Sequence, residues 1–336
     1  MENTCILIHG SSLYSSLLEP YLILLRKYWN DCSFPVFVNI DKNLKKEYFC
    51  LQEKYNVEFI ISDIEPNAYT ACDRIYYALQ ELEKKFEYVI FTLDDNFLCR
   101  KMNNDDMKDI VKFIDSDKNV GCISLYRSSS LIKNFYKKMK YRGFFENNKD
   151  EYFDNLCGHC LDKLYISKPL YLPHLEAGLR PDFTNSPNVL IKHKNKNYVN
   201  FHKINHLNPQ PRIWNLKFFK DGLDKLVNPC NKLKILKEKE KKNCATLHLM
   251  EIFGAKYNKH FNLFTSKLML EMEDQVSIYW QGRWFCGSSV NRGKALKWVK
   301  ELFEENNIKF NYFHNDYVID MPLKILKLGN KTRGLL

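Results

Sequence analysis

The amino-acid sequence predicts an α/β fold in which helices flank a central sheet. Short apolar runs alternate with amphipathic stretches of helical length over residues 5–100, and this alternation is typical of parallel strands joined by right-handed crossovers. Hydrophobic residues make up 45% of the 336 residues, which is enough for a large core. The apolar runs also end in polar or acidic residues, so we expect a polar edge at the carboxyl ends of the strands.

The elements follow from periodicity and from residues that begin or end them. Uncharged runs rich in β-branched and aromatic residues predict strands, and apolar residues at helical spacing predict helices. The expected strands are residues 5–9, 35–40, 57–61 and 88–93, and the expected helices are residues 13–29, 47–55 and 71–86. The strands end near His9, Asp41, Asp63 and Asp94. In a parallel sheet these four side chains would share one edge.

The most informative stretch is Glu87–Arg100. Its apolar run predicts a strand buried on both faces, and the run stops at two adjacent acids, Asp94 and Asp95. Carboxylate oxygens at this edge suit Mg²⁺ or Mn²⁺ carrying substrate phosphates. The alternative is that Asp94, Asp95 and Asn96 form a turn that only ends the strand, because these residue types favour turns.

The order and spacing of these segments resemble the GT-A nucleotide-sugar glycosyltransferases. The resemblance extends from the first strand through the expected strand at residues 120–126. It implies a mixed, Rossmann-related sheet flanked by helices. It also implies that an acidic triplet after the fourth strand, here Asp94, Asp95 and Asn96, binds a divalent metal and the donor diphosphate. Asn96 departs from the family pattern, which has an acid at the third position. Three alternatives follow: Asn96 binds the metal through its neutral oxygen, Asp95 replaces it as the metal ligand, or the activity depends less on a metal.

The same resemblance implies a function. We expect a metal-dependent glycosyltransferase that moves a sugar from a UDP- or GDP-sugar to a glycan or other hydroxyl acceptor, with Mn²⁺ or Mg²⁺ as cofactor. An upstream arginine that reaches the nucleotide corresponds to Arg74. We also assign His9, Asp41, Asp73 and Asp94 to the nucleotide site. The alternatives are that Arg74 forms a surface ion pair with Asp73 and that Asp41 simply ends its strand.

The catalytic base and a further metal ligand are expected downstream. An inverting transferase needs a carboxylate that takes the proton of the acceptor hydroxyl, and Glu176 or Asp182 lies in the corresponding part of the chain. An exposed loop with an ion pair between Arg180 and Asp182 is the alternative. The resemblance also implies a late histidine ligand, for which His206 is the candidate together with His202; here the alternative is a solvent-exposed basic loop.

A boundary is expected near residue 230. The charged run at residues 232–242 follows a proline-containing segment, so we expect a transferase domain at residues 1–230 and a smaller α/β or helical annex at residues 231–336. The annex would bind the acceptor or mediate oligomerisation, with helices over residues 244–272 and 292–306. The basic run could instead lie along an anionic membrane surface as a peripheral contact.

Composition bears on the partners, the localisation and the state of the cysteines. The formal charge of +11 favours acidic partners such as nucleotide sugars. We expect a cytoplasmic protein, because the sequence has neither a signal peptide nor an apolar stretch long enough to span a membrane. The eleven cysteines are expected to be reduced thiols, since Cys157 and Cys160 lack a second pair at zinc-binding spacing.

Two other function classes have partial support in the sequence. Lys294, Asp316 and Asp320 resemble the last motifs of haloacid-dehalogenase-type Mg²⁺ phosphatases, in which Asp94 would be the nucleophile, but Asn96 stands where that family has an acid. A non-catalytic nucleic-acid-binding protein would fit the positive charge, yet no nucleic-acid-binding motif is present. We therefore expect no nucleic-acid partner.

Overall fold

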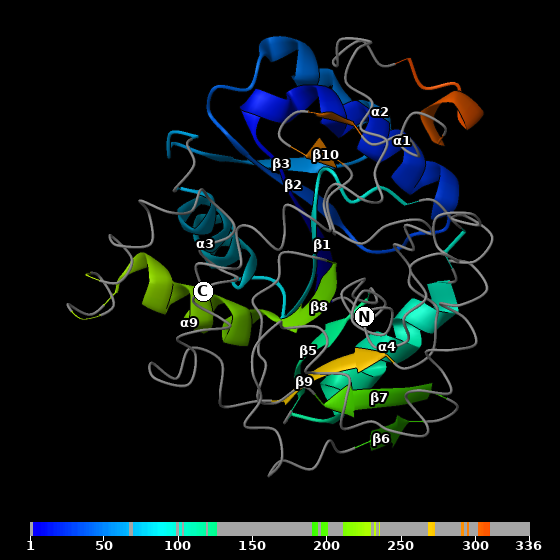
Figure 1. Cartoon of the computed structure of the whole chain (residues 1–336), viewed down its shortest axis with the longest axis vertical. Helices are drawn as coiled ribbons and strands as arrows, with labels where there is room; N and C mark the ends of the chain where they lie inside the picture. Colours follow the sequence, from blue (N-terminus) through cyan, green and yellow to red (C-terminus); the bar gives the residue numbers. More distant parts are fainter. Residues whose placement is uncertain are drawn as a thin grey trace, which may run out of the picture.

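The computed structural model describes residues 3–125 almost continuously and several later segments (Figure 1). The described residues are 3–66, 70–98, 101–102, 104–118, 120–125, 190–193, 196–200, 211–229, 232, 235, 268–272, 290–291, 294–295 and 302–309.

The N-terminal elements follow the predicted alternation. They are β1 (Thr4–His9), η1 (Ser12–Leu17), α1 (Leu18–Tyr28), β2 (Val36–Asp41), η2 (Lys46–Phe49), α2 (Cys50–Tyr55), β3 (Glu58–Ser62), α3 (Ala71–Leu82), β4 (Tyr88–Leu93), α4 (Asn104–Ser116) and β5 (Val120–Ser124). The later elements are β6 (Leu190–His193), β7 (Lys196–Asn200), β8 (Arg212–Asn215), α9 (Leu216–Val227), β9 (Leu268–Met272), β10 (Val290–Asn291) and β11 (Lys294–Ala295).

One sheet of nine strands organises the described residues, in the order β3-β2-β1-β4-β8-β5-β9-β7-β6. The first four strands are parallel, as expected from the crossovers. β8 then runs antiparallel between β4 and β5, and this strand makes the sheet mixed. The predicted α/β class, a mixed sheet flanked by helices, is confirmed.

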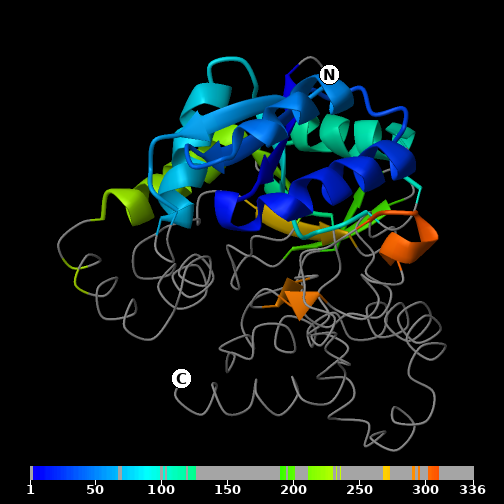
Figure 2. The same ribbon diagram turned by 90° about the horizontal axis from the view of Figure 1, so that it is seen from above.

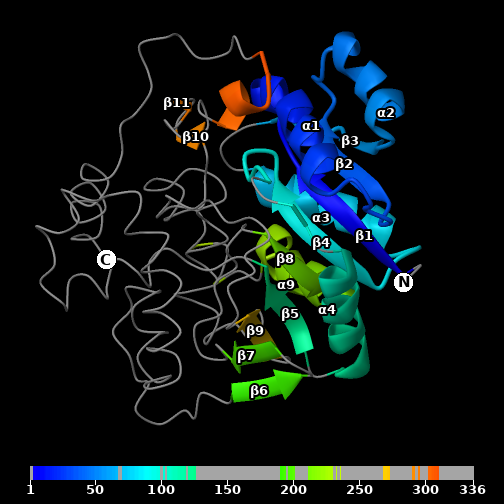
Figure 3. The ribbon, with the colours of Figure 1, turned by 90° about the vertical axis from the view of Figure 1, so that its right-hand side faces the viewer.

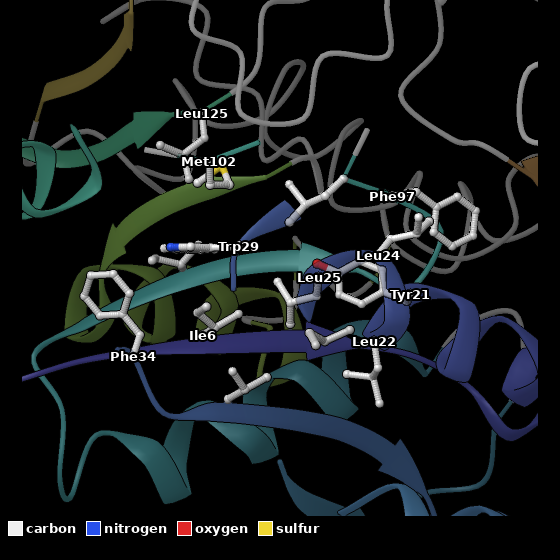
Figure 4. Packing of buried hydrophobic residues seen from close by; sticks show 14 of the residues in the cluster. Ile6, Tyr21, Leu22, Leu24, Leu25, Trp29, Phe34, Phe97, Met102 and Leu125 are labelled. Atoms are coloured by element: carbon white, nitrogen blue, oxygen red, sulfur yellow. The ribbon is translucent and has the colours of Figure 1, made fainter. Parts of the chain in front are cut away.

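Helices cover both faces of the sheet (Figure 2). On one face, α1 and α4 enclose a core cluster that includes Ile6, Ile8 and Ile90, with Tyr21, Trp29 and Met102 among its larger members (Figure 4). On the other face, α3 and α9 cover Cys5, Leu7, Val89 and Phe91. Alternate residues of β1 and β4 therefore enter two different cores, which is why these strands are apolar without interruption.

Segments far beyond residue 230 also belong to this body. β9 pairs in parallel with β5 and antiparallel with β7, so the helix expected over residues 244–272 is wrong for its last five residues, which continue the sheet. Residues 302–308 add Leu302, Phe303 and Ile308 to the α1 core, and their short helix lies beside α1 (Figure 3). The separate annex at residues 231–336 stays a prediction for the other residues.

For the described residues, the structure bears on membrane-spanning helices and on the state of the cysteines. No helix among them is long and apolar enough to cross a membrane. Their cysteines are reduced thiols, namely Cys5, Cys32, Cys50, Cys72 and Cys122. Burial raises the pKa of the Cys32 thiol to about 11, which makes this thiol a poor nucleophile at neutral pH.

Candidate functional site

The carboxyl ends of three neighbouring strands meet at one edge of the sheet. β2 and β1 end at Asp41 and His9, and β4 ends just before Asp94. Backbone bonds tie these ends together, because Gly10 N donates to Asn39 O over 3.0 Å and Asp94 N donates to His9 O over 3.1 Å. Three of the side chains assigned to the nucleotide site thus lie at one edge, as the parallel strands required.

Arg74 reaches this edge from the first turn of α3 and is buried, with 4% of its surface exposed. Its Nη1 donates to Gly10 O over 2.8 Å and lies 3.4 Å from Asp41 Oδ2. Burial lowers the pKa of the guanidinium, while the carboxylates of Asp41 and Asp94 raise it. Arg74 pairs with Asp41 inside the protein, so the surface ion pair with Asp73 is wrong.

Asp41 orders the turn that follows β1. Its Oδ2 accepts from Ser12 N over 2.9 Å and from Ser11 Oγ over 3.4 Å, and its Oδ1 accepts from Asn43 N over 3.1 Å. The residue has no exposed surface. Its carboxylate is therefore engaged by the protein itself, and it fixes the backbone of Ser11 and Ser12 beside Arg74.

A buried asparagine joins β1 to α3. Asn39 Nδ2 lies 2.9 Å from His9 Nδ1 and donates to Arg74 O over 3.0 Å. Because the amide nitrogen can only donate, His9 Nδ1 is the acceptor and the ring proton lies on Nε2. Burial and then the charge of Arg74 lower the pKa of His9 well below its usual range. His9 is thus a neutral member of a buried network.

Asp94 is a second carboxylate near Arg74. It is half-buried, and a Cβ added to Gly10 would lie 2.9 Å from its Oδ2. Burial raises the pKa of the Asp94 carboxyl well above its usual range and the neighbouring charge of Asp95 raises it further, whereas Arg74 and the N–H of Ser11 lower it. A further positive charge beside Asp94 would therefore favour its ionised form.

Asp94 and Asp95 form the centre of a turn, Leu93–Asn96, which we call the acidic turn. Asn96 N donates to Leu93 O over 3.1 Å, and Asn96 Nδ2 donates to Asp95 Oδ1 over 3.1 Å. Asn96 has no exposed surface, whereas Asp95 is half-buried. Of the three alternatives left open for this triplet, burial favours Asp95 as the second ligand.

The residues of the acidic turn fit a divalent cation. The charges of the adjacent carboxylates Asp94 and Asp95 repel one another, which adds to the effect of burial on the pKa of Asp94, and a cation bound to both would relieve this repulsion. Within the ranges that the structure describes, no group of three or more His, Cys, Asp or Glu side chains is placed to hold a metal ion. The further ligand predicted at His206 lies outside these ranges, as does His202.

The remaining site predictions are not tested by the geometry. Glu176 and Asp182, the candidate bases, lie outside the described residues. Asp73 is half-buried in the first turn of α3.

Neither the contacts of Asn39 nor the close approach of Gly10 to Asp94 was predicted from the sequence. The signal for Asn39 was a polar residue within the otherwise apolar run of β2. For Gly10, it was a glycine immediately after a buried strand.

Comparisons with known proteins give weak likenesses. No protein-family model and no curated protein matches the chain. One matching structure is the mannosyltransferase Ktr4p from S. cerevisiae, with 15% identity, a TM-score of 0.32, and coverage of 71% of this chain and 62% of that chain. Another is core-mannan synthase A (CmsA/Ktr4) from Aspergillus fumigatus in its Mn/GDP form, with 13% identity, a TM-score of 0.35, and coverage of 79% and 71%.

The chain thus spans less than two thirds of the first of these structures. At these TM-scores the likeness supports no conclusion about activity.

Proposed function

We propose that this chain is a metal-dependent glycosyltransferase that moves a sugar from a UDP- or GDP-sugar to a glycan or other hydroxyl acceptor. The observation that carries the proposal is the half-buried pair Asp94 and Asp95, which follows a central parallel strand and lies beside the buried Arg74. Ligands of open α/β sheets bind at this edge. The mixed sheet between helices is also what the GT-A resemblance implies.

Each residue of the edge has a distinct part in this proposal. Asp94 and Asp95 would hold Mn²⁺ or Mg²⁺, which when bound neutralises the negative charge that develops on a departing diphosphate. Arg74 is engaged by Gly10 O and Asp41, so it contributes a fixed positive charge behind the turn. Glu176 or Asp182 stays the predicted base if the enzyme inverts configuration.

The phosphatase alternative receives no support from the acidic turn. That chemistry needs a general acid two residues after the nucleophile, and Asn96 is a buried amide at that position. A nucleic-acid-binding role is supported by net charge alone.

The test is a thermal-shift screen of the full chain against UDP-, GDP- and CMP-sugars, each with and without Mn²⁺. A ligand that binds only the folded state stabilises it by about 2.7 kcal/mol at a hundred times its Kd. We expect a UDP- or GDP-sugar to raise the Tm only when Mn²⁺ is present. Asp94→Asn and Asp95→Asn should each remove most of that rise, and each should leave the chain folded.

Asp63→Asn is the matched control. Asp63 follows β3 at the same edge of the sheet but is exposed, so its loss should leave the Mn²⁺-dependent shift unchanged. If excess chelator does not reduce the nucleotide-sugar shift, or if all three variants behave alike, the proposed metal site is wrong. Stabilisation by vanadate or by an oligonucleotide instead would point to one of the other two classes.

A further inference from the structure

Residues 302–308, here called the late segment, pack against Phe97, the residue that follows the acidic turn. Leu302, Phe303 and Ile308 are 6%, 3% and 9% exposed, and they belong to the same core cluster as α1, Phe97 and Leu98. The short helix of this segment lies against α1 in two perpendicular views (Figures 1 and 3). A segment remote in sequence thus contributes to the core next to Asp94 and Asp95.

The backbone at the end of the late segment brings two of its apolar side chains, Phe303 and Ile308, close together in the core. Asn307 has a positive φ of 52°. Ile308 N donates to Phe303 O over 2.8 Å, and Asn307 N donates to Glu304 O over 3.1 Å. This pair of bonds is a Schellman motif, which brings the residue after the left-handed position onto the last helical turn. Phe303 and Ile308 therefore enter the core together.

Phe97 connects the late segment to the acidic turn. Phe97 is fully buried only two residues after Asp95, and its ring lies edge-on to Phe303, with centroids 5.1 Å apart. The centroid of the Tyr21 ring lies 6.3 Å from that of Phe97, and Figure 4 shows Phe97 beside Tyr21 and Leu24. Phe97 is therefore held between α1 and the late segment.

A second contact holds the same region. The Tyr28 hydroxyl lies 3.4 Å from Asn306 Oδ1, and Asn306 Nδ2 donates to Leu302 O over 2.6 Å. Met102 N donates to Tyr28 O over 2.6 Å. The end of α1 thus contacts both the late segment and the chain that leaves the acidic turn.

The two sides of the acidic turn are fixed in different ways. Its entry is held by the ladder between β1 and β4, which continues to the bond from Asp94 N to His9 O. Its exit is held by the packing of Phe97 and Leu98 in the α1 core. The direction in which the chain leaves Asp95 therefore depends on what Phe97 packs against.

We infer that Phe303 is a positioning residue for the metal-binding pair, because its ring, acting through Phe97, fixes the exit of the acidic turn. This inference rests on the proposed function. A metal site requires its ligands to be held within a fraction of an ångström by the residues behind them. Loosening Phe97 should consequently lower metal affinity, although neither aromatic ring contacts the metal.

The test compares two Phe→Leu variants of the full chain. Phe303→Leu removes the ring behind Phe97. Phe34→Leu is the control, because Phe34 is 4% exposed, belongs to the same core cluster and lies edge-on to Trp29 at 5.7 Å. Phe34 precedes β2, so it lies at the end of the sheet opposite the acidic turn. Tm and the Mn²⁺ dissociation constant by calorimetry are measured for each.

We expect the two variants to lose similar Tm, because the rings are equally buried. Phe303→Leu should weaken Mn²⁺ binding roughly fivefold, in the range of couplings between contacting residues, and Phe34→Leu should leave it within about twofold of the parent. Phe97→Leu should weaken binding at least as much, and adding Phe303→Leu to it should cause little further loss.

Equal Mn²⁺ affinities for Phe303→Leu and Phe34→Leu would overturn the inference and leave the proposed function standing. So would independent, additive losses from Phe97→Leu and Phe303→Leu. A parent chain that binds no Mn²⁺ would overturn the metal-dependent function itself, and the inference with it.

Discussion

At the scale of single residues, the Asp94 side chain leaves no room for a side chain at Gly10. Its φ is outside the left-handed region, so an alanine could adopt the backbone, but the added Cβ would lie 2.9 Å from Asp94 Oδ2. Gly10→Ala should therefore displace the Asp94 carboxylate and weaken Mn²⁺ binding by roughly an order of magnitude, since contacting groups couple by up to about 3 kcal/mol.

The matched test of Gly10 uses a second background. Asp94→Ala has no carboxylate for the new methyl group to displace, so adding Gly10→Ala to it should cost little further stability. The unfolding midpoint in urea gives both comparisons. A large cost of Gly10→Ala in both backgrounds would show that the added Cβ meets the backbone and not the Asp94 side chain.

His9 makes the free energy of unfolding depend on pH. Burial and Arg74 hold the folded-state pKa of His9 well below its usual value, so protonation favours the unfolded chain. The stability that the neutral ring contributes is fully present above about pH 6.5 and is lost as the pH falls below that value. Each unit of pH below 6.5 should cost up to about 1.4 kcal/mol from this one group.

The variant that isolates this effect is His9→Asn, because an amide oxygen can accept from Asn39 Nδ2 at the position of Nδ1. Its free energy of unfolding, measured between pH 7.5 and 5.5, should fall less steeply than that of the parent. Identical slopes would mean that His9 is not the neutral acceptor described here.

At the scale of elements, α9 begins at a side-chain cap. Asn215 Oδ1 accepts from Phe218 N over 3.0 Å, and the Asn215 backbone is extended. Asn215→Ala should cost about 1 kcal/mol of unfolding free energy, the usual effect of removing such a cap. Asn228→Ala at the other, exposed end of α9 removes only a bond to Asp224 and should cost a few tenths of a kcal/mol. Chemical denaturation distinguishes the two, and equal losses would show that the cap contributes nothing specific.

The elements also differ in how far the sequence predicted them. β1, β2, β3 and β4 were predicted within a residue or two. β1, β2 and β4 are buried on both faces, and this burial accounts for their apolar runs, whereas β3 is a partly exposed edge strand with a shorter apolar run. β8 was not predicted, although Ile213 and Trp214 have strand propensity and Asn215 is a capping residue. Its position between β4 and β5 depends on long-range pairing, which local periodicity does not report. For the same reason β9 was expected to be helical.

At the scale of the whole molecule, the sequence predicted which side chains share one edge of the sheet better than it predicted the contacts that they make there. Parallel strands brought His9, Asp41 and Asp94 to one edge, and this followed from the alternation of elements. That Arg74 and Asp41 are engaged with one another inside the protein did not follow, because burial depends on how α3 packs against the sheet. The contribution of Phe303 required knowledge of tertiary contacts between residues 97 and 303.

The position of β4 determines when the site can form during synthesis. β4 pairs on one side with β1, which is made early, and on the other with β8, which leaves the ribosome much later. The edge of β4 that receives β8 therefore stays open while more than a third of the chain is being made, and exposed strand edges invite pairing with other chains. Contacts of such high sequence separation also slow folding. A nascent chain consequently carries Asp94 and Asp95 long before β8 and the late segment are available to pack beside them.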